Sequence, residues 1–140
     1  LDYKIKLVDY GDIEVQLTPL QKAVYLFFLN HPEGIMFNSV YEYRDELLSI
    51  YLSITNRDDM AQLKASIDDL VDPLSNSLSE KCSKIRSAFL MKIDERLAKH
   101  YLIDGQRGMP KSIKLPRDLV CFDYNSGNTP FQKSIFVDNS

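Results

Sequence analysis

The sequence predicts an α+β fold in which helices supply most of the core and short strands lie before and after them. Apolar residues recur at steps of three and four in several separate segments, which is the spacing of one buried helical face. Polar and apolar residues alternate near both ends of these segments, beside clusters of turn-forming residues, as they do in β-hairpins.

The composition indicates a single globular domain. The 140 residues are 44% hydrophobic and 26% charged, which is ordinary for one soluble domain. We expect no membrane span, because no eighteen consecutive residues are apolar. We also expect no signal peptide, because the first residues lack the basic, apolar and small-residue pattern of one. We expect Cys82 and Cys121 to be small buried side chains in a reducing, cytoplasmic environment. Because the chain begins with Leu1, we expect a piece of a longer protein with domains before it.

The N-terminal segment predicts a β-hairpin followed by a helix. Residues 3–8 and 13–17 alternate in polarity around a turn at residues 9–12. Thr18, Pro19 and Gln21 then form a helix start, with a capping box and proline in the first turn. Pro32 ends this helix, whose residues 23–29 are all apolar and are therefore expected to be buried centrally.

Two further helices are predicted in the middle of the chain. After a turn and a short strand at residues 35–37, Ser39 and Glu42 form a capping box for a helix that runs to Ile54. Apolar residues then predict a helix over residues 59–71. The aspartates at its end lack the spacing of a calcium loop, so we expect no metal there.

Residues 77–117 organise the predicted fold. Ser77 and Glu80 form a capping box, so we expect a helix from Leu78 to about His100. Strands at residues 101–103 and 112–115 are expected to flank a loop that holds two glycines and a proline. The apolar stripe of the helix is expected to be Leu78, Cys82, Ile85, Phe89, Ile93 and Leu97.

Three core helices, one inserted helix and a final hairpin, or wing, make a winged helix-turn-helix fold. We expect this domain to span residues 1–122, with a possible strand at residues 119–122. Residues 123–140 are expected to form a tail that is either a mobile terminus or an added edge strand. The inserted helix is the one at residues 59–71.

The chain resembles the OmpR/PhoB-type effector domains of bacterial response regulators. The resemblance is carried by residues 15–21 at the entry to the first helix, residues 31–34 at its end, residues 82–86 in the recognition helix, and Arg107-Gly108 in the wing. The longer connection with its own helix at residues 59–71 departs from that family. The resemblance implies the DNA-binding domain of a bacterial transcriptional regulator, with its recognition helix in the major groove.

Charge is distributed unevenly along the chain. Residues 77–117 hold ten Lys and Arg against four Asp and Glu, whereas residues 1–76 hold six against thirteen. Such a basic segment on an acidic protein favours local binding of a polyanion. The alternative is that these lysines and arginines only solvate the helix and the hairpin.

Helical spacing selects the side chains that would meet double-stranded DNA. Ser83, Lys84 and Ser87 point away from the apolar stripe and are expected to contact base edges or phosphates. Arg107, at the tip of the wing, is expected to enter the minor groove. The complete set of expected DNA-binding residues is Lys81, Ser83, Lys84, Ser87, Arg107, Lys111 and Lys114.

Other residues favour a protein-interaction module instead. Glu80 and Met91 also face outward and Leu90 faces sideways, so we expect Leu90 and Met91 to pack against the helix at residues 59–71. This packing would form within the chain or across a homodimer. We expect no enzyme activity, catalytic residue, cofactor or metal, because no nucleotide-binding, metalloprotease or nucleophile motif is present.

Overall fold

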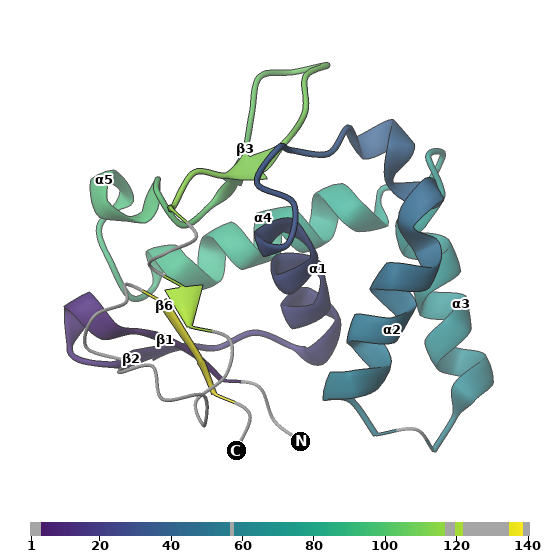
Figure 1. Ribbon diagram of the computed structural model, residues 1–140, viewed down its shortest axis with the longest axis horizontal. Coiled ribbons are helices and arrows are strands. Elements are labelled where there is room, and N and C mark those ends of the chain that lie inside the picture. The colour runs from purple at the N-terminus through teal and green to yellow at the C-terminus, as the bar shows by residue number, and fades with distance from the viewer. Residues whose placement is uncertain (1–3, 57, 117–119, 122–134, 139–140) are drawn as a thin grey trace.

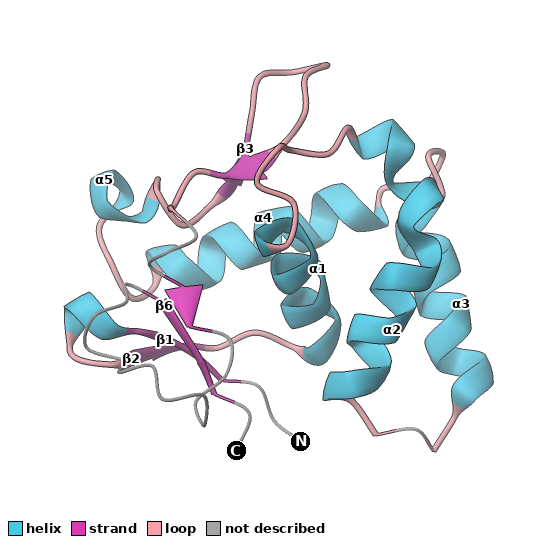
Figure 2. Ribbon diagram, viewed as in Figure 1, coloured by secondary structure: helices cyan, strands magenta, loops and turns pink. Residues whose placement is uncertain are grey.

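A computed structural model describes residues 4–56, 58–116, 120–121 and 135–138. The predicted α+β class is confirmed: helices fill the centre and one side of the molecule, and a four-stranded sheet lies on the other side with two short helical segments (Figure 2). The helical elements are α1 (Pro19–Leu29), α2 (Arg44–Ile54), α3 (Met60–Val71), α4 (Ser77–Leu90), α5 (Glu95–Ala98) and the 3₁₀ segments η1 (Val8–Tyr10) and η2 (Phe37–Tyr43).

Helix α1 lies at the centre of the molecule (Figure 1). Its predicted capping box is confirmed: Thr18 Oγ1 accepts from the Gln21 amide at 3.3 Å, and Gln21 Oε1 accepts from the Thr18 amide at 3.0 Å. Residues 21–29 are buried on every side. The prediction that this helix is buried centrally, made from its run of apolar residues, is therefore confirmed.

The predicted start of the second helix is wrong. Residues 37–43 form 3₁₀ turns instead, and α2 begins at Arg44 without a side-chain cap. The 3₁₀ turns bury Val40 completely while Glu42 faces solvent, so Ser39 and Glu42 do not cap a helix. Helix α3 is confirmed and lies beside α2 (Figure 1), with Asp59 as its N-cap.

The prediction of one helix from Leu78 to His100 is also wrong. The backbone amides of Lys92 and Ile93 both donate to the Phe89 carbonyl, which ends α4, and Asp94 caps the separate short helix α5. This turn leaves Leu97 exposed rather than on the buried stripe.

The predicted capping box at the start of α4 is absent as well. The Ser77 amide donates to Ser75 Oγ at 3.0 Å, and Asn76 is the N-cap without a side-chain hydrogen bond. Because Ser77 already has helical geometry, its hydroxyl does not cap the amide of Glu80, which donates instead to the Asn76 carbonyl.

The N-terminal hairpin is confirmed and extends into a larger sheet. Strands β1 (Lys4–Leu7) and β2 (Ile13–Val15) pair antiparallel, β6 (Ile135–Asp138) pairs with the other side of β1, and β5 (Val120–Cys121) runs parallel to β6. Strand β6 thus lies inside the sheet and not at its edge, where the tail was expected to add a strand. Residues 119 and 122 of the predicted strand and residues 123–134 and 139–140 of the predicted tail lie outside the described residues.

The second hairpin, predicted as a wing, is present with shorter strands than expected. Strands β3 (Ile103–Asp104) and β4 (Ser112–Ile113) pair antiparallel, and a single bridge joins Lys111 to Ile35. Tyr101 lies in the core instead of a strand, because its carbonyl accepts the Tyr25 hydroxyl at 2.7 Å. The hairpin projects from α4 on the side away from the four-stranded sheet (Figure 1).

Candidate nucleic-acid interface

Helix α4 presents a polar face to solvent. Leu78, Ile85 and Phe89 are buried, while Ser83 and Ser87 are exposed about half a turn away. The exposed residues of its first three turns are Ser79, Glu80, Ser83, Lys84, Arg86 and Ser87. The predicted outward direction of Ser83, Lys84 and Ser87 therefore agrees with their exposure.

A groove of about 640 Å³ separates this helix from the β3–β4 hairpin. Ser83 of α4 lines one side, and Arg107 and Lys111 of the hairpin line the other, so three of the predicted residues meet here. Its apolar lining includes Met36 and Phe37. The remaining lining residues are Asn38, Ser79, Cys82, Ile103, Asp104, Gly105, Gly108 and Met109.

Lys111 makes hydrogen bonds within its own hairpin. Its Nζ donates to the carbonyl oxygens of Gly105 at 2.6 Å and Gln106 at 2.9 Å, and it lies 5.9 Å from the centre of the Phe37 ring. The two carbonyl oxygens take up two of the three N–H donors of this ammonium, which makes Lys111 a weaker candidate for a phosphate contact than the exposed Lys114. Lys111 instead fixes the shape of the hairpin loop.

The other predicted cations lie apart from the groove. Lys81 is half-buried, with its Nζ 3.5 Å from Glu80, and Lys84 lies on α4 outside the groove lining. Lys114 is exposed between two buried neighbours at the end of β4. Of the predicted DNA-binding residues, Ser83, Arg107 and Lys111 therefore line the groove, and Lys81, Lys84 and Lys114 lie outside it.

Ion pairing further reduces the available positive charge. Arg86 donates to Glu95 of α5 at 2.6 Å, so α5 holds the guanidinium at the side of α4. Asp104 lines the groove and accepts from the Gly105 amide. Among the groove-lining cations, the exposed Arg107 at the hairpin tip is the one best placed to meet an anion.

Three polar groove residues were not predicted, namely Asp104, Ser79 and Asn38. Ser79 and Asn38 line both the groove and an adjoining cavity of about 220 Å³ near the start of α4. The helical spacing from Ser83 could have identified Ser79, which lies one turn earlier. Nothing in the sequence pattern indicated Asn38, because η2 brings it to α4 from a distant part of the chain.

Cys82 lines this groove as a thiol of low reactivity. Burial raises the pKa of its thiol to about 12, and the nearby Lys111 ammonium offsets that effect only in part. The thiol therefore stays protonated at neutral pH, as expected for a small packing residue. The side chain of Cys121 lies outside the described part of the chain.

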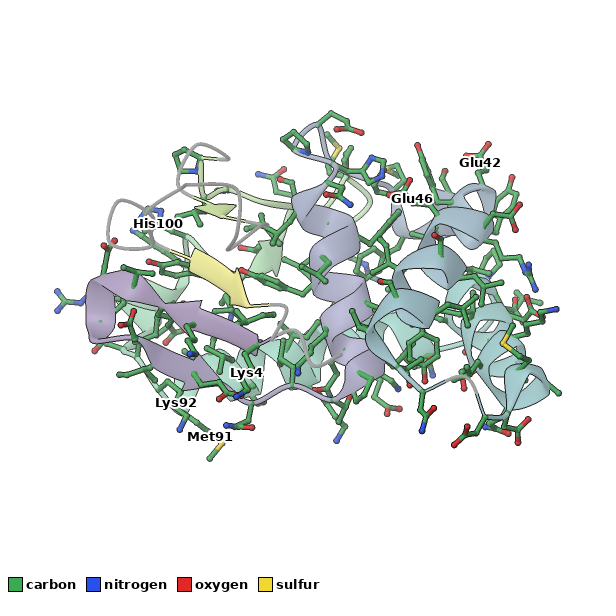
Figure 3. All side chains as sticks on the ribbon, turned by 60° about the horizontal axis from the view of Figure 1, so that its bottom comes forward. Lys4, Glu42, Glu46, Met91, Lys92 and His100 are labelled. Atoms are coloured by element: carbon green, nitrogen blue, oxygen red, sulfur yellow. The ribbon has the colours of Figure 1, made fainter. Side chains whose placement is uncertain are left out.

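The prediction that α3 covers Leu90 and Met91 within the chain is wrong. Leu63, Ile67 and Leu70 of α3 are buried where α3 packs against α2, η2 and α4. Met91 is 82% exposed and lies at the opposite end of the molecule from Glu42 and Glu46 of the η2–α2 segment (Figure 3). Packing of these residues across a homodimer stays a prediction.

The described residues contain neither a metal-binding cluster nor a membrane-spanning helix. Within residues 4–56, 58–116, 120–121 and 135–138, no three His, Cys, Asp or Glu side chains cluster in a way that could hold a metal ion. No helix in that part of the chain has the length and apolar character needed to cross a bilayer. Comparisons with protein-family models, curated proteins and solved structures find no match to this chain.

Proposed function

We propose that this chain is a winged helix-turn-helix domain that binds double-stranded DNA as part of a bacterial transcriptional regulator. Helix α4 acts as the recognition helix in the major groove, and the β3–β4 hairpin acts as the wing on the flanking backbone and minor groove. The observation that carries the proposal is the exposed polar face of α4 beside a hairpin that bears Arg107 at its tip.

The geometry of α4 supports this function. The major groove of B-DNA is about 12 Å wide and admits one α-helix. The 14 residues of α4 project an exposed face that carries serine hydroxyls, which donate to or accept from base edges, with Lys84 beside them. Its other face is anchored by Ile85 and Phe89 in the core, so the helix is rigidly held for docking.

The hairpin supports the same orientation. Arg107 lies next to Gly108, whose φ of +77° forms the tight tip, and the loop is held by Lys111. An arginine on such a projecting loop can enter the narrow minor groove, where the negative potential is strong. Acidic residues in the first half of the chain would repel DNA from the other faces and orient the approach.

A protein-interaction module is the second candidate, and exposed apolar side chains favour it. Leu74 in the loop before α4 is 94% exposed, and Met91 at the end of α4 is almost as accessible. Side chains of this kind are common at protein–protein contacts. A regulator could use them for a partner while α4 binds DNA, so the two functions are separable by mutation.

A pair of charge-introducing variants tests the proposed function. Ser83→Glu adds a carboxylate to the groove-facing side of α4, and we expect it to weaken duplex binding at least tenfold through repulsion of phosphates. Ser49→Glu adds the same charge to the exposed surface of α2 and is expected to retain binding. Equal binding by both variants in an electrophoretic mobility assay would contradict the assignment of α4 as the recognition helix.

A further inference from the structure

Glu80 lies in the row of α4 side chains that faces directly away from the core. It is three residues before Ser83 and seven before Ser87, which is the spacing of one helical face, and about 180° around the helix from the buried Phe89. Its side chain is 58% exposed. A carboxylate therefore stands where a recognition helix would penetrate most deeply.

The carboxylate of Glu80 has unused capacity to accept hydrogen bonds. Lys81 Nζ lies 3.5 Å away, well beyond the 2.7–2.9 Å or so of a strong charge-assisted hydrogen bond. The capping box that would have turned Glu80 back onto the backbone is absent, because the Ser77 amide donates to Ser75. Its residual structural role is a favourable interaction with the positive end of the helix dipole.

Only a few groups on DNA can accommodate a carboxylate. Phosphates repel it, and its two oxygens can only accept hydrogen bonds. In the major groove, the donors are the exocyclic amino groups of cytosine and adenine. Adenine also presents its N7 acceptor beside the amino group, which would repel a carboxylate, whereas cytosine presents no acceptor next to its amino group.

We propose that Glu80 is a specificity-determining residue that accepts a hydrogen bond from the N4 amino group of a cytosine in the major groove. This inference rests on the DNA-binding function proposed above and adds the base that the helix selects. Lys84, four residues on, lies close enough along the helix to contact the neighbouring phosphate and offset the local repulsion. The negative charge of Glu80 thus lowers non-specific affinity and raises selectivity.

Selection from a random duplex pool, followed by sequencing, tests this assignment with the 140-residue chain. We expect the parent protein to enrich sites with cytosine at one position. Glu80→Ala should lose that preference by about fivefold or more, and Glu80→Gln should shift it toward adenine, which a carboxamide contacts at N6 and N7 together. Glu42→Gln removes one exposed carboxylate from η2 and is the matched control. We expect this variant to select sites with the same preference for cytosine as the parent protein.

The outcomes distinguish the role of Glu80 in base selection from DNA binding itself. An unchanged motif in both Glu80 variants, or duplex binding with no base preference, overturns the role of Glu80 and leaves DNA binding intact. No binding of any duplex by the parent protein overturns both. If Glu80 serves only the helix dipole, Glu80→Gln will lower the melting temperature without changing the selected base, which also overturns the inference.

Discussion

Lys111 ties the two ends of the β3–β4 loop together by donating from its Nζ to the Gly105 carbonyl oxygen at 2.6 Å. The loop has no room for a larger residue at position 105, since a Cβ there would clash with the Pro110 carbonyl oxygen. Lys111 also pairs through its backbone with Ile35, which connects the hairpin to the segment after α1. The hairpin tip is therefore positioned by side-chain and backbone hydrogen bonds of Lys111, and Arg107 is held at its end.

Lys111→Ala and Lys114→Ala should weaken DNA binding in different ways. Loss of Lys111 frees the loop, so we expect faster amide hydrogen exchange in residues 105–110 and no change in the salt dependence of binding. Loss of the exposed Lys114 should leave the loop protected but reduce the magnitude of the salt slope by about 0.9, the value of one phosphate contact. Identical exchange in the parent protein and Lys111→Ala would show that this lysine does not hold the loop.

Phe89→Ala should destabilise the fold by about 3–5 kcal/mol, because the ring is fully buried. The ring stacks on Tyr101 at 6.0 Å between centroids and lies 5.3 Å from Tyr25, so its loss opens a cavity at the end of α4. Met91→Ala is the control, and we expect it to change the free energy of unfolding by less than about 0.5 kcal/mol. Urea denaturation of both variants measures the difference, and equal midpoints would contradict the position of α4 in the core.

His31 should make the fold less stable as the pH rises. Burial by itself lowers the pKa of His31, but hydrogen bonds to Glu33 at 2.9 Å and Glu46 at 2.8 Å raise it more, so the net pKa lies above its ordinary value. The folded state thus prefers the protonated ring. This stabilisation is complete below the unfolded value of 6.5 and is lost as the pH rises through the folded pKa.

Denaturation at a series of pH values from about 5.5 to 8.5 measures this effect. We expect His31→Gln to lose the decline in the free energy of unfolding over that window. His100→Gln, at the exposed other histidine, should retain it. A parent protein whose stability rises with pH through this range would contradict the two carboxylate contacts of His31.

Capping residues and apolar periodicity correctly predicted those helices and strands that pack in the fold as their own sequence pattern indicates. Thr18 and Gln21 formed the capping box expected of them, and the period-two pattern of the first fifteen residues produced the N-terminal hairpin. The start of the second helix and the end of α4 were mispredicted for a common reason. Val40 and Tyr101 are drawn into the core by contacts distant in sequence, and periodicity along one segment does not contain that information.

The candidate interface was predictable only in part for the same reason. Helical spacing correctly oriented Ser83 and Ser87, because one buried face fixes the opposite one. The role of Lys111 depends on carbonyl groups in a loop whose conformation no residue pattern specifies. Likewise, Asn38 reaches the groove because the tertiary fold brings η2 and the start of α4 to the same cavities.

Fluorescence anisotropy of pooled random duplexes, titrated with the 140-residue chain at low salt, tests the central claim most directly. We expect binding with a dissociation constant below about 10⁻⁴ M, the weak end of ordinary non-specific affinity. The logarithm of the association constant should then fall with the logarithm of salt concentration, with a slope near −2.7 for about three phosphate contacts. Anisotropy that stays flat up to about 10⁻⁴ M protein would contradict DNA binding and favour the protein-interaction module.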